Sequence, residues 1–547
     1  MIAAALLLAA VAPVLAAPNT DAVSVCQHLH TVYPQYTVWD PTGTYATETF
    51  WNQSYYSNAV KEYWNGVNAD NRPACAFFPA TAQQVSVAVQ QLNKYPTAPF
   101  ALKAGGHNFN VGFSSTNGGV LISFNENMSS TTRNSDGQSF DIGPGARWGD
   151  VYAVTQKTNQ VVVGGRLANI GVAGLTTGGG LSYYSAQYVL TLPHPPSAPS
   201  YQHPNTNPTQ GLACDNVVNF EVVLGNGTIT NANSTSNPDL WWALRGGGNR
   251  FGIVTKFTLK AHPLGDNGQV WGGIRSYTAD KREQIFEALS NFTSEYPDAK
   301  AAIIPTFDFG LPGALVSNPG IFFFYDGAKP SANAFAGLED IESFIDSTKT
   351  TSYTDLTNAV GGAKIYGINA AIHVNTFPNM PSQQMTQLFE THWTTYQSMI
   401  KNDSSRNLDF QLGTFTPQPL SVRIARASQN AGGNALGLDP AYGDRVWVEN
   451  DLIWVNPVCN DACPEYLREV ADTVKESFNN TLLGTKPTHY QSGDVDWISS
   501  NPLFMNDAAD YQDVYGSYGP TNKARLASIA KAYDPTGFMF RQGGWSF

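Results

Sequence analysis

The stretch Lys103-Ala-Gly-Gly-His-Asn-Phe-Asn-Val-Gly-Phe-Ser-Ser115 decides how the rest of the chain is interpreted. A short apolar run over 99–102 predicts a strand that leads directly into two glycines and His107. Paired glycines adopt positive φ and let a backbone approach a ligand closely. Successive N–H groups in such a turn form a concave site for an anion such as a diphosphate. Taken alone, the pattern fits a tight turn with an incidental surface histidine equally well.

A second glycine-rich stretch favours the interpretation of the first one as a ligand-binding loop. Gly171-Val-Ala-Gly174 is followed by Thr176-Thr-Gly-Gly-Gly180. Two such loops in one N-terminal half predict a single extended cofactor, a dinucleotide whose reactive end lies near His107.

These stretches resemble the flavin domain of the berberine bridge enzyme-like oxidoreductases, within the vanillyl-alcohol oxidase superfamily. The resemblance continues through Asp215-Asn-Val-Val218, Gly246-Gly-Gly-Asn249, Phe251-Gly-Ile-Val254 and Tyr533-Asp-Pro535. It runs from about Cys75 to the C-terminus and is weak between about 270 and 500. It implies an α+β fold of two domains, a PCMH-type FAD-binding domain and a substrate domain in which a sheet is backed by helices.

The resemblance also implies which residues contact FAD. In this family the histidine at position 107 is joined covalently to the flavin 8α-methyl carbon. Leu167 stands where members with two covalent links carry a cysteine, so we expect a single link. The expected FAD-binding residues are Lys103, Ala104, Gly105, Gly106, His107, Asn108, Ser114, Gly171, Gly174, Thr177, Gly178, Gly179 and Ile253.

Three residues are candidates for catalysis. Tyr188 matches a family tyrosine, and Asn506 with Asp507 stands where the family often has Asn-Tyr. A base must remove a proton while the flavin accepts a hydride. Asp507 departs from the family pattern, which leaves open whether it is a base or a hydrogen-bonding wall. A surface tyrosine and a helix-capping aspartate are the plain alternatives.

We therefore expect an FAD-dependent oxidase that converts O2 to H2O2 while oxidising a sugar, an oligosaccharide or a secondary-metabolite alcohol. Ile170 resembles a family gatekeeper at which Val accompanies oxygen reactivity and Leu its loss, and Ile is β-branched like Val. The alternatives are a flavin dehydrogenase with another acceptor and a catalytically dead secreted flavoprotein.

Composition limits the partners. The chain has 547 residues, of which 14% are charged, and a net charge of −12, which argues against nucleic acid. Nine histidines occur without HExxH or Cys-x-x-Cys spacing, so no metal site is expected. We expect a monomer that uses a small molecule and O2, with no membrane partner.

The first 16 residues are apolar and end in small residues, as in a signal peptide, so we expect secretion. Cys26 and Cys75 resemble the family's N-terminal disulfide. Cys459 and Cys463 are four apart and close a ring if the geometry allows, whereas Cys214 is expected to be a buried thiol. Seven Asn-x-Ser/Thr sequons, at Asn52, Asn127, Asn226, Asn233, Asn291, Asn402 and Asn479, fit a secreted glycoprotein.

The expected organisation is a FAD-binding domain over 17–265, a substrate domain over 266–503, and a C-terminal segment over 504–547 that returns to the FAD domain. A helix is expected over 332–345. Residues 189–210 contain six prolines and no glycine or charge, and they interrupt the family pattern. Our hypothesis is a translated intron; the alternative is a natural proline-rich surface loop.

Overall fold

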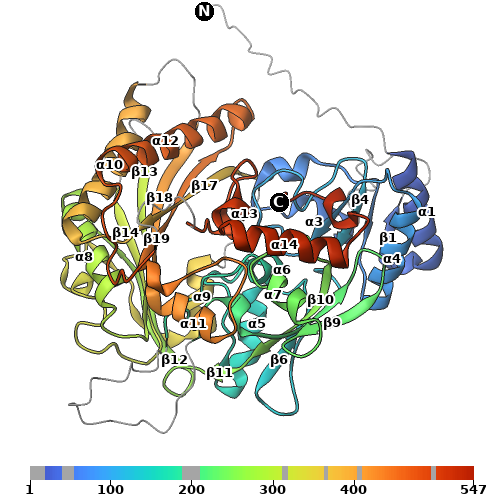
Figure 1. Ribbon diagram of the computed structural model, residues 1–547, viewed down its shortest axis with the longest axis horizontal. Helices are drawn as coiled ribbons and strands as arrows, with labels where there is room; N and C mark the ends of the chain where they lie inside the picture. The colour runs from blue at the N-terminus through green and yellow to red at the C-terminus, as the bar shows by residue number, and fades with distance from the viewer. Residues whose placement is uncertain are drawn as a thin grey trace, which may run out of the picture.

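The computed structural model describes residues 19–39, 54–187, 210–310, 318–361, 367–402, 410–493 and 501–547. Figure 1 shows a body built from the N-terminal half together with the C-terminal segment, beside a second body of long strands covered by helices. The fold is mixed α and β, as expected. The expected signal peptide, Tyr188 and residues 189–209 lie outside the described residues.

The first layer is a four-stranded sheet in the order β1-β2-β4-β3, in which β2 and β3 both run parallel to β4. Helix α4 (Ala82–Lys94) begins at Thr81, whose side chain accepts a hydrogen bond from the Gln84 N–H. It buries an apolar face against this sheet, together with α1 (Thr20–Val32). The remaining elements are β1 (Thr37–Trp39), α3 (Ser54–Lys61), η2 (Gly66–Asp70), β2 (Cys75–Phe77), β3 (Phe100–Lys103) and β4 (Val120–Ser123).

The second layer is a five-stranded antiparallel sheet in the order β5-β6-β10-β8-β9. Strands β8 (Val217–Val223) and β9 (Ile229–Asn233) form the hairpin that the Asn226-Gly227 pair indicates. The other elements of this region are β5 (Thr131–Arg133), β6 (Ser139–Ile142), α5 (Trp148–Thr155), β7 (Gln160–Val161), α6 (Val172–Thr177), η4 (Ala213–Asn216), α7 (Pro238–Leu244), β10 (Ile253–Lys260) and β11 (His262–Pro263).

The second body is an eight-stranded sheet in the order β15-β12-β14-β13-β18-β19-β17, with β16 paired to β12. Helices α8, α10 and α12 pack on one of its faces, where Phe286 and Phe389 meet Phe415. The strands are β12 (Gln269–Ser276), β13 (Ala301–Gly310), β14 (Pro319–Tyr325), β15 (Ile345–Asp346), β16 (Lys349–Ser352), β17 (Asn369–Pro378), β18 (Phe410–Leu420) and β19 (Arg445–Trp454). The helices are α8 (Arg282–Glu295), α9 (Tyr353–Gly361), α10 (Ser382–Asn402), α11 (Val422–Asn430) and α12 (Cys459–Thr481).

Because side chains alternate along a strand, the opposite face of this sheet carries a different set. Thr414 pairs in register with Asp308 of β13 and with Asp451 of β19, so these three side chains lie on one face. Glu449 lies two residues before Asp451 and is on the same side. These polar residues line the face that lacks α8, α10 and α12.

The helix expected over 332–345 is wrong. Asn333, Ala336 and Gly337 have left-handed φ values of 57°, 55° and 87°, which no right-handed helix accommodates. The segment instead forms turns, one short 3-10 helix, η6 (Leu338–Asp340), and β15. Asn237 precedes α7 but does not cap it, because its side-chain oxygen accepts from the Tyr533 hydroxyl at 3.3 Å and not from a helix N–H.

The C-terminal segment packs against the glycine-rich half, and Figure 1 shows α14 lying across it. The buried Arg250 guanidinium donates to the carbonyls of Met539, Gln542 and Trp545. The Tyr515 and Tyr518 hydroxyls donate to the Gly247 and Gly246 carbonyls at 2.9 and 3.1 Å. Its helices are η8 (Met505–Asp507), α13 (Val514–Ser517), α14 (Pro520–Tyr533) and η9 (Phe538–Arg541).

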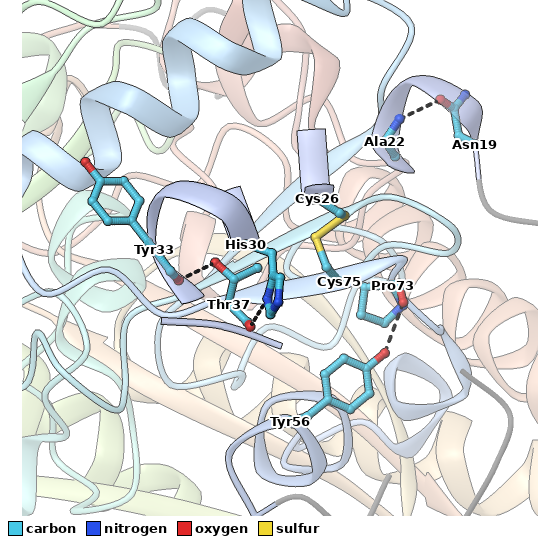
Figure 2. The surroundings of a disulfide bond; sticks show 9 residues. All are labelled: Asn19, Ala22, Cys26, His30, Tyr33, Thr37, Tyr56, Pro73 and Cys75. Carbon is cyan, nitrogen blue, oxygen red and sulfur yellow. Dashed lines mark hydrogen bonds between the residues drawn. A yellow bond between two sulfur atoms is a disulfide. The ribbon is translucent and has the colours of Figure 1, made fainter. Parts of the chain in front are cut away.

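Two disulfides are present and match the expected pairs. Cys26–Cys75 joins α1 to β2 (Figure 2), and Cys459–Cys463 lies at the start of α12. Cys214 is a free, buried thiol. No helix among the described residues is long and apolar enough to cross a membrane.

The suspected insert leaves and re-enters the fold at one place. The Gln210 N–H donates to the Gln187 carbonyl at 3.3 Å, and the Gly211 N–H donates to the Ser185 carbonyl at 3.1 Å. The residues flanking 188–209 are therefore already in contact, an arrangement that both a natural loop and a translated intron require.

Replacing Cys26 and Cys75 together by serine should lower the free energy of unfolding by about 4 kcal/mol, because the disulfide closes a loop of 49 residues in the unfolded chain. Chemical denaturation measures the loss. The matched control replaces Cys459 and Cys463, whose loop of four residues predicts about 2 kcal/mol. Equal losses in the two variants would contradict the loop-closure account.

Candidate functional site

The two glycine-rich loops touch each other. A Cβ added to Gly105 would lie 2.6 Å from both the Cα and the N of Gly171, and a Cβ on Gly171 would meet Gly105 equally closely. Any side chain at either position would separate the two backbones. The predicted loops therefore form one structure, with the end of β3 on one side and the start of α6 on the other.

Arg147 lies beside this contact. Residue 147 forms a β-bridge with Gly171, and its guanidinium donates to the Asn169 carbonyl and pairs with Glu62 at 3.7 Å. The Trp148 N–H donates to the Ile170 carbonyl at 3.0 Å. The segment at the start of α5 thus fixes the second loop where it meets the first.

His107 lies at the end of the first loop. Its half-buried ring packs against Trp64 with a centroid distance of 5.2 Å. Burial, with a further contribution from the positive charge of Arg147, lowers the pKa of His107 to about 4. The imidazole is therefore neutral near neutral pH and keeps a nitrogen lone pair for bond formation.

Lys103 anchors the first loop from behind. Its ammonium donates to the carbonyls of Asn58 and Ala59, at the end of α3, and lies 4.1 Å from the centre of the Tyr63 ring. The side chain is 1% exposed. Lys103 therefore positions the loop through the hydrogen bonds that its ammonium donates to these carbonyls.

Asn506 anchors the second loop, as Lys103 anchors the first. Its amide donates to the carbonyls of Gly174 and Leu175 at 3.1 and 3.2 Å and accepts from the Gly180 N–H at 3.1 Å. A Cβ on Gly178 would lie 2.5 Å from this amide. These contacts make Asn506 a positioning residue for the loop.

Other expected residues are distributed around this centre. The Thr177 carbonyl accepts the N–H groups of Gly246 and Gly248, both at 3.0 Å. The Cys214 N–H donates to the Gly179 carbonyl at 2.9 Å. The Asn108 side chain accepts from the Asn110 N–H. Ala104 is half-buried and Ile253 is buried in β10, and Gly106 has a left-handed φ of 69°.

The residues fit a flavin dinucleotide. The buried hydroxyl of Ser114 has no hydrogen-bond partner among the described residues, so a donor or acceptor site is available beside the loop. A Cβ on Gly174 would meet nothing within 4 Å, which leaves open space beside the second loop. No group of three His, Cys, Asp or Glu side chains among those described is arranged to hold a metal ion.

A carboxyl pair lies beside the second loop. The carboxyl of Asp507, in η8, interacts electrostatically with that of Glu449 in β19. Burial, and then the neighbouring Glu449, raise the pKa of Asp507 well above its usual range.

Further polar side chains surround this pair. The Gln418 amide donates to Glu449 at 3.1 Å and accepts from the guanidinium of Arg166. Asp451 accepts from the Thr414 hydroxyl at 2.7 Å, and burial together with Glu449 raises the pKa of Asp451 to about 8.

Sequence reasoning named Asp507 as a candidate but not Glu449, Gln418 or Arg166, which the structure connects to it. A signal was present: Glu449 and Asp451 are two carboxyls on one face of a strand whose other residues are mostly apolar, a pattern that indicates a polar site rather than core. Tyr188, the other expected catalytic residue, lies outside the described residues.

Residues 73–192 match the family model described as an FAD binding domain. An uncharacterised FAD-linked oxidoreductase of Arthroderma benhamiae is 32% identical over 499 residues, which cover 89% of each chain. The chain belongs to the FAD-linked oxidoreductases. An FAD-dependent monooxygenase of Fusarium proliferatum is 30% identical, with 88% of this chain and 85% of the relative covered.

Solved structures share the fold of this oxidoreductase. Xylooligosaccharide oxidase from Myceliophthora thermophila C1 matches with a TM-score of 0.69 at 17% identity, over 96% of this chain and all of the other. Berberine bridge enzyme matches with a TM-score of 0.62 at 16% identity, over 89% of this chain and 93% of the other. The resemblance drawn from the sequence is confirmed.

Asn506→Ala should lower the free energy of unfolding by about 2 kcal/mol, because three hydrogen bonds to the second loop are lost. The bound flavin should also dissociate more readily. Denaturant titration and flavin absorbance after dialysis measure the two effects. As a control, Asn219→Ala removes hydrogen bonds in the exposed β8–β9 hairpin and should retain full flavin. Equal flavin retention in both variants would contradict the role given to Asn506.

Proposed function

We propose that this FAD-linked oxidoreductase is a secreted oxidase that carries FAD covalently on His107 and oxidises an alcohol-type small molecule with O2 to H2O2. The observation that carries the proposal is the joined pair of glycine loops, with a neutral His107 at one end and the Asp507–Glu449 pair beside the second loop. Bound FAD supplies the acceptor for the substrate hydride.

The side chains of this chain supply the remaining functions. The backbone N–H groups of the glycine loops bind the diphosphate. Neutral His107 offers the nitrogen that forms the single covalent link, and Leu167 has no atom that forms a second one. The carboxyls of Asp507 and Glu449 take up the substrate hydroxyl proton, and the raised pKa of Asp507 favours its role as the base.

The proposed electron acceptor, O2, and the proposed substrate are supported by different observations. Ile170 is half-buried next to Gly171 and β-branched like the Val that accompanies oxygen reactivity at this family position, so the resemblance favours reaction with O2. Solved structures of the same fold include a xylooligosaccharide oxidase and a carbohydrate oxidase from Microdochium nivale, so sugars head the substrate panel. The two disulfides support secretion, since disulfides persist in oxidising compartments. A monomer is the expected state.

A monooxygenase is the second candidate, because several relatives over most of the chain, including the Fusarium proliferatum protein, bear that name. Such an enzyme would place an oxygen atom in its product, whereas an oxidase releases H2O2. A flavin dehydrogenase would turn over with an artificial acceptor and form no H2O2 in air.

The function is tested with purified, yellow protein on a panel of sugars, oligosaccharides and phenolic alcohols. We expect stoichiometric H2O2 and an oxidised product without added oxygen from 18O2. Glu449→Gln should lower kcat by at least about 100-fold, since a base contributes a factor of this size. Turnover only with an artificial acceptor, or 18O in the product, would replace the oxidase with one of the alternatives.

His107→Ala should abolish covalent attachment while retaining some bound FAD, because the diphosphate site is built from backbone groups. Acid precipitation should leave a yellow pellet for the wild type and a colourless pellet for the variant. Peptide mass spectrometry of the wild type should find flavin on the 103–112 region alone. A yellow variant pellet, or a second flavinylated peptide, would refute attachment through His107.

A further inference from the structure

The imidazole of His107 has a ring contact but no hydrogen bond to orient it. No described residue is hydrogen-bonded to either ring nitrogen of His107. A hydrogen bond to a ring nitrogen normally fixes the orientation of an imidazole. Such a bond holds most other described histidines, namely His30, His262, His373, His392 and His489. At His107 the orientation depends instead on the neighbouring ring of Trp64.

Trp64 covers one face of this imidazole. The ring centroids are 5.2 Å apart and the ring planes make an angle of 31°, so the two rings meet through their faces. A face contact leaves the edge of the imidazole, which carries both nitrogens, uncovered by the indole. The contact therefore restricts rotation of the His107 ring and still leaves a nitrogen available for bond formation.

The backbone of Trp64 is attached to the loop that it covers. The Trp64 N–H donates to the Gly106 carbonyl at 3.0 Å. The hydroxyl of the preceding residue, Tyr63, is buried and donates to the Ser114 carbonyl at 2.9 Å. The indole is therefore placed against His107 by hydrogen bonds to both ends of the loop.

The residue after Trp64 fixes the segment from the other side. The amide nitrogen of Asn65 donates to the Phe109 carbonyl at 2.7 Å, and its oxygen accepts from the Ala370 N–H of β17 at 3.3 Å. Asn65 is itself buried. Trp64 thus lies between two buried residues that both bind the His107 loop.

The Trp64 side chain is not part of the core. It is half-buried and belongs to none of the hydrophobic clusters formed by the described residues. Its one aromatic ring contact among these residues is with His107. A large aromatic side chain that is held rigidly outside the core, against a histidine of the cofactor loop, indicates a role in the site.

We propose that Trp64 is a positioning residue for the covalent attachment of FAD, because it restricts the His107 imidazole to the orientation in which the bond forms. The inference rests on the proposed function, which includes this bond. A nitrogen lone pair of His107 forms the bond to the flavin 8α carbon, the imidazole releases its N–H proton, and the 8α carbon loses a C–H proton. The electron pair of that C–H bond passes to the flavin and then to O2, which takes both protons and leaves as H2O2.

Trp64→Leu keeps an apolar side chain and removes the aromatic face. Purified holoprotein is compared with the wild type by total flavin per protein and by the share of that flavin that stays in an acid precipitate. Bound flavin should remain, because the diphosphate site is built from backbone groups. The acid-stable share should fall about tenfold after the same expression time, because a small misplacement of a reacting group slows bond formation strongly.

Two further variants separate positioning from a general loss of structure. Trp64→Phe restores an aromatic face and should recover most of the acid-stable flavin. Trp39→Leu is the matched control, since Trp39 packs in the same way against His30, a histidine of α1, at 5.7 Å between ring centroids. It should keep the acid-stable share of the wild type. Thermal unfolding shows whether Trp64→Leu is folded, and Trp64→Met, which also lacks an aromatic face, replaces it if it is not.

An acid-stable share in Trp64→Leu equal to that of the wild type would overturn the proposal. A loss of bound flavin with an unchanged acid-stable share would overturn it as well, since a purely structural role predicts that result. Acid-labile flavin in the wild type would refute the proposed attachment and with it this inference, whereas acid-stable flavin in both proteins would refute this inference alone.

Discussion

The contact between Gly105 and Gly171 is the constraint on which the rest of the site depends. It requires that neither residue carry a side chain, because a Cβ at either position would lie less than 3 Å from the other backbone. It also requires that β3 end and α6 begin at the same point. Arg147, Lys103 and Asn506 each hold one part of this junction through backbone carbonyls. These contacts determine where His107 lies.

The second constraint is the alternation of side chains along β18 and β19. With α8, α10 and α12 burying the face that carries Phe415, the residues one position away must lie on the opposite face. Glu449 and Gln418 therefore lie on the face opposite these helices. Asp507, from the C-terminal segment, interacts with Glu449 of this face, and burial followed by Glu449 raises the pKa of Asp507.

The parts of the site that are local in sequence were predictable. The strand, the glycine loops, His107 and the disulfide Cys26–Cys75 follow from short motifs or from the family resemblance. Glu449 was not predictable in the same way, because its partners Asp507 and Arg166 lie far along the chain and the resemblance is weak between about 270 and 500. Asn506 was identified, but only the structure shows its amide holding the second loop.

The helix expected over 332–345 was wrong for a similar reason, because contacts distant in sequence determine the conformation there. Its composition permits a helix, but the left-handed φ at Asn333 and Ala336 is imposed by packing that the sequence does not display. Phe335, between these residues, is buried edge-on against Phe323 of β14. A tertiary contact thus decided the local conformation.

The most direct test of the account is the flavin content of Gly171→Ala, measured as the ratio of flavin to protein absorbance. The added methyl must push Gly105 away, so we expect a protein that folds but loses most of its flavin. Gly320→Ala adds the same methyl where nothing lies within 4 Å and should keep a full complement. A Gly171→Ala protein with the flavin content of the wild type would contradict the claim that the two loops form one cofactor site.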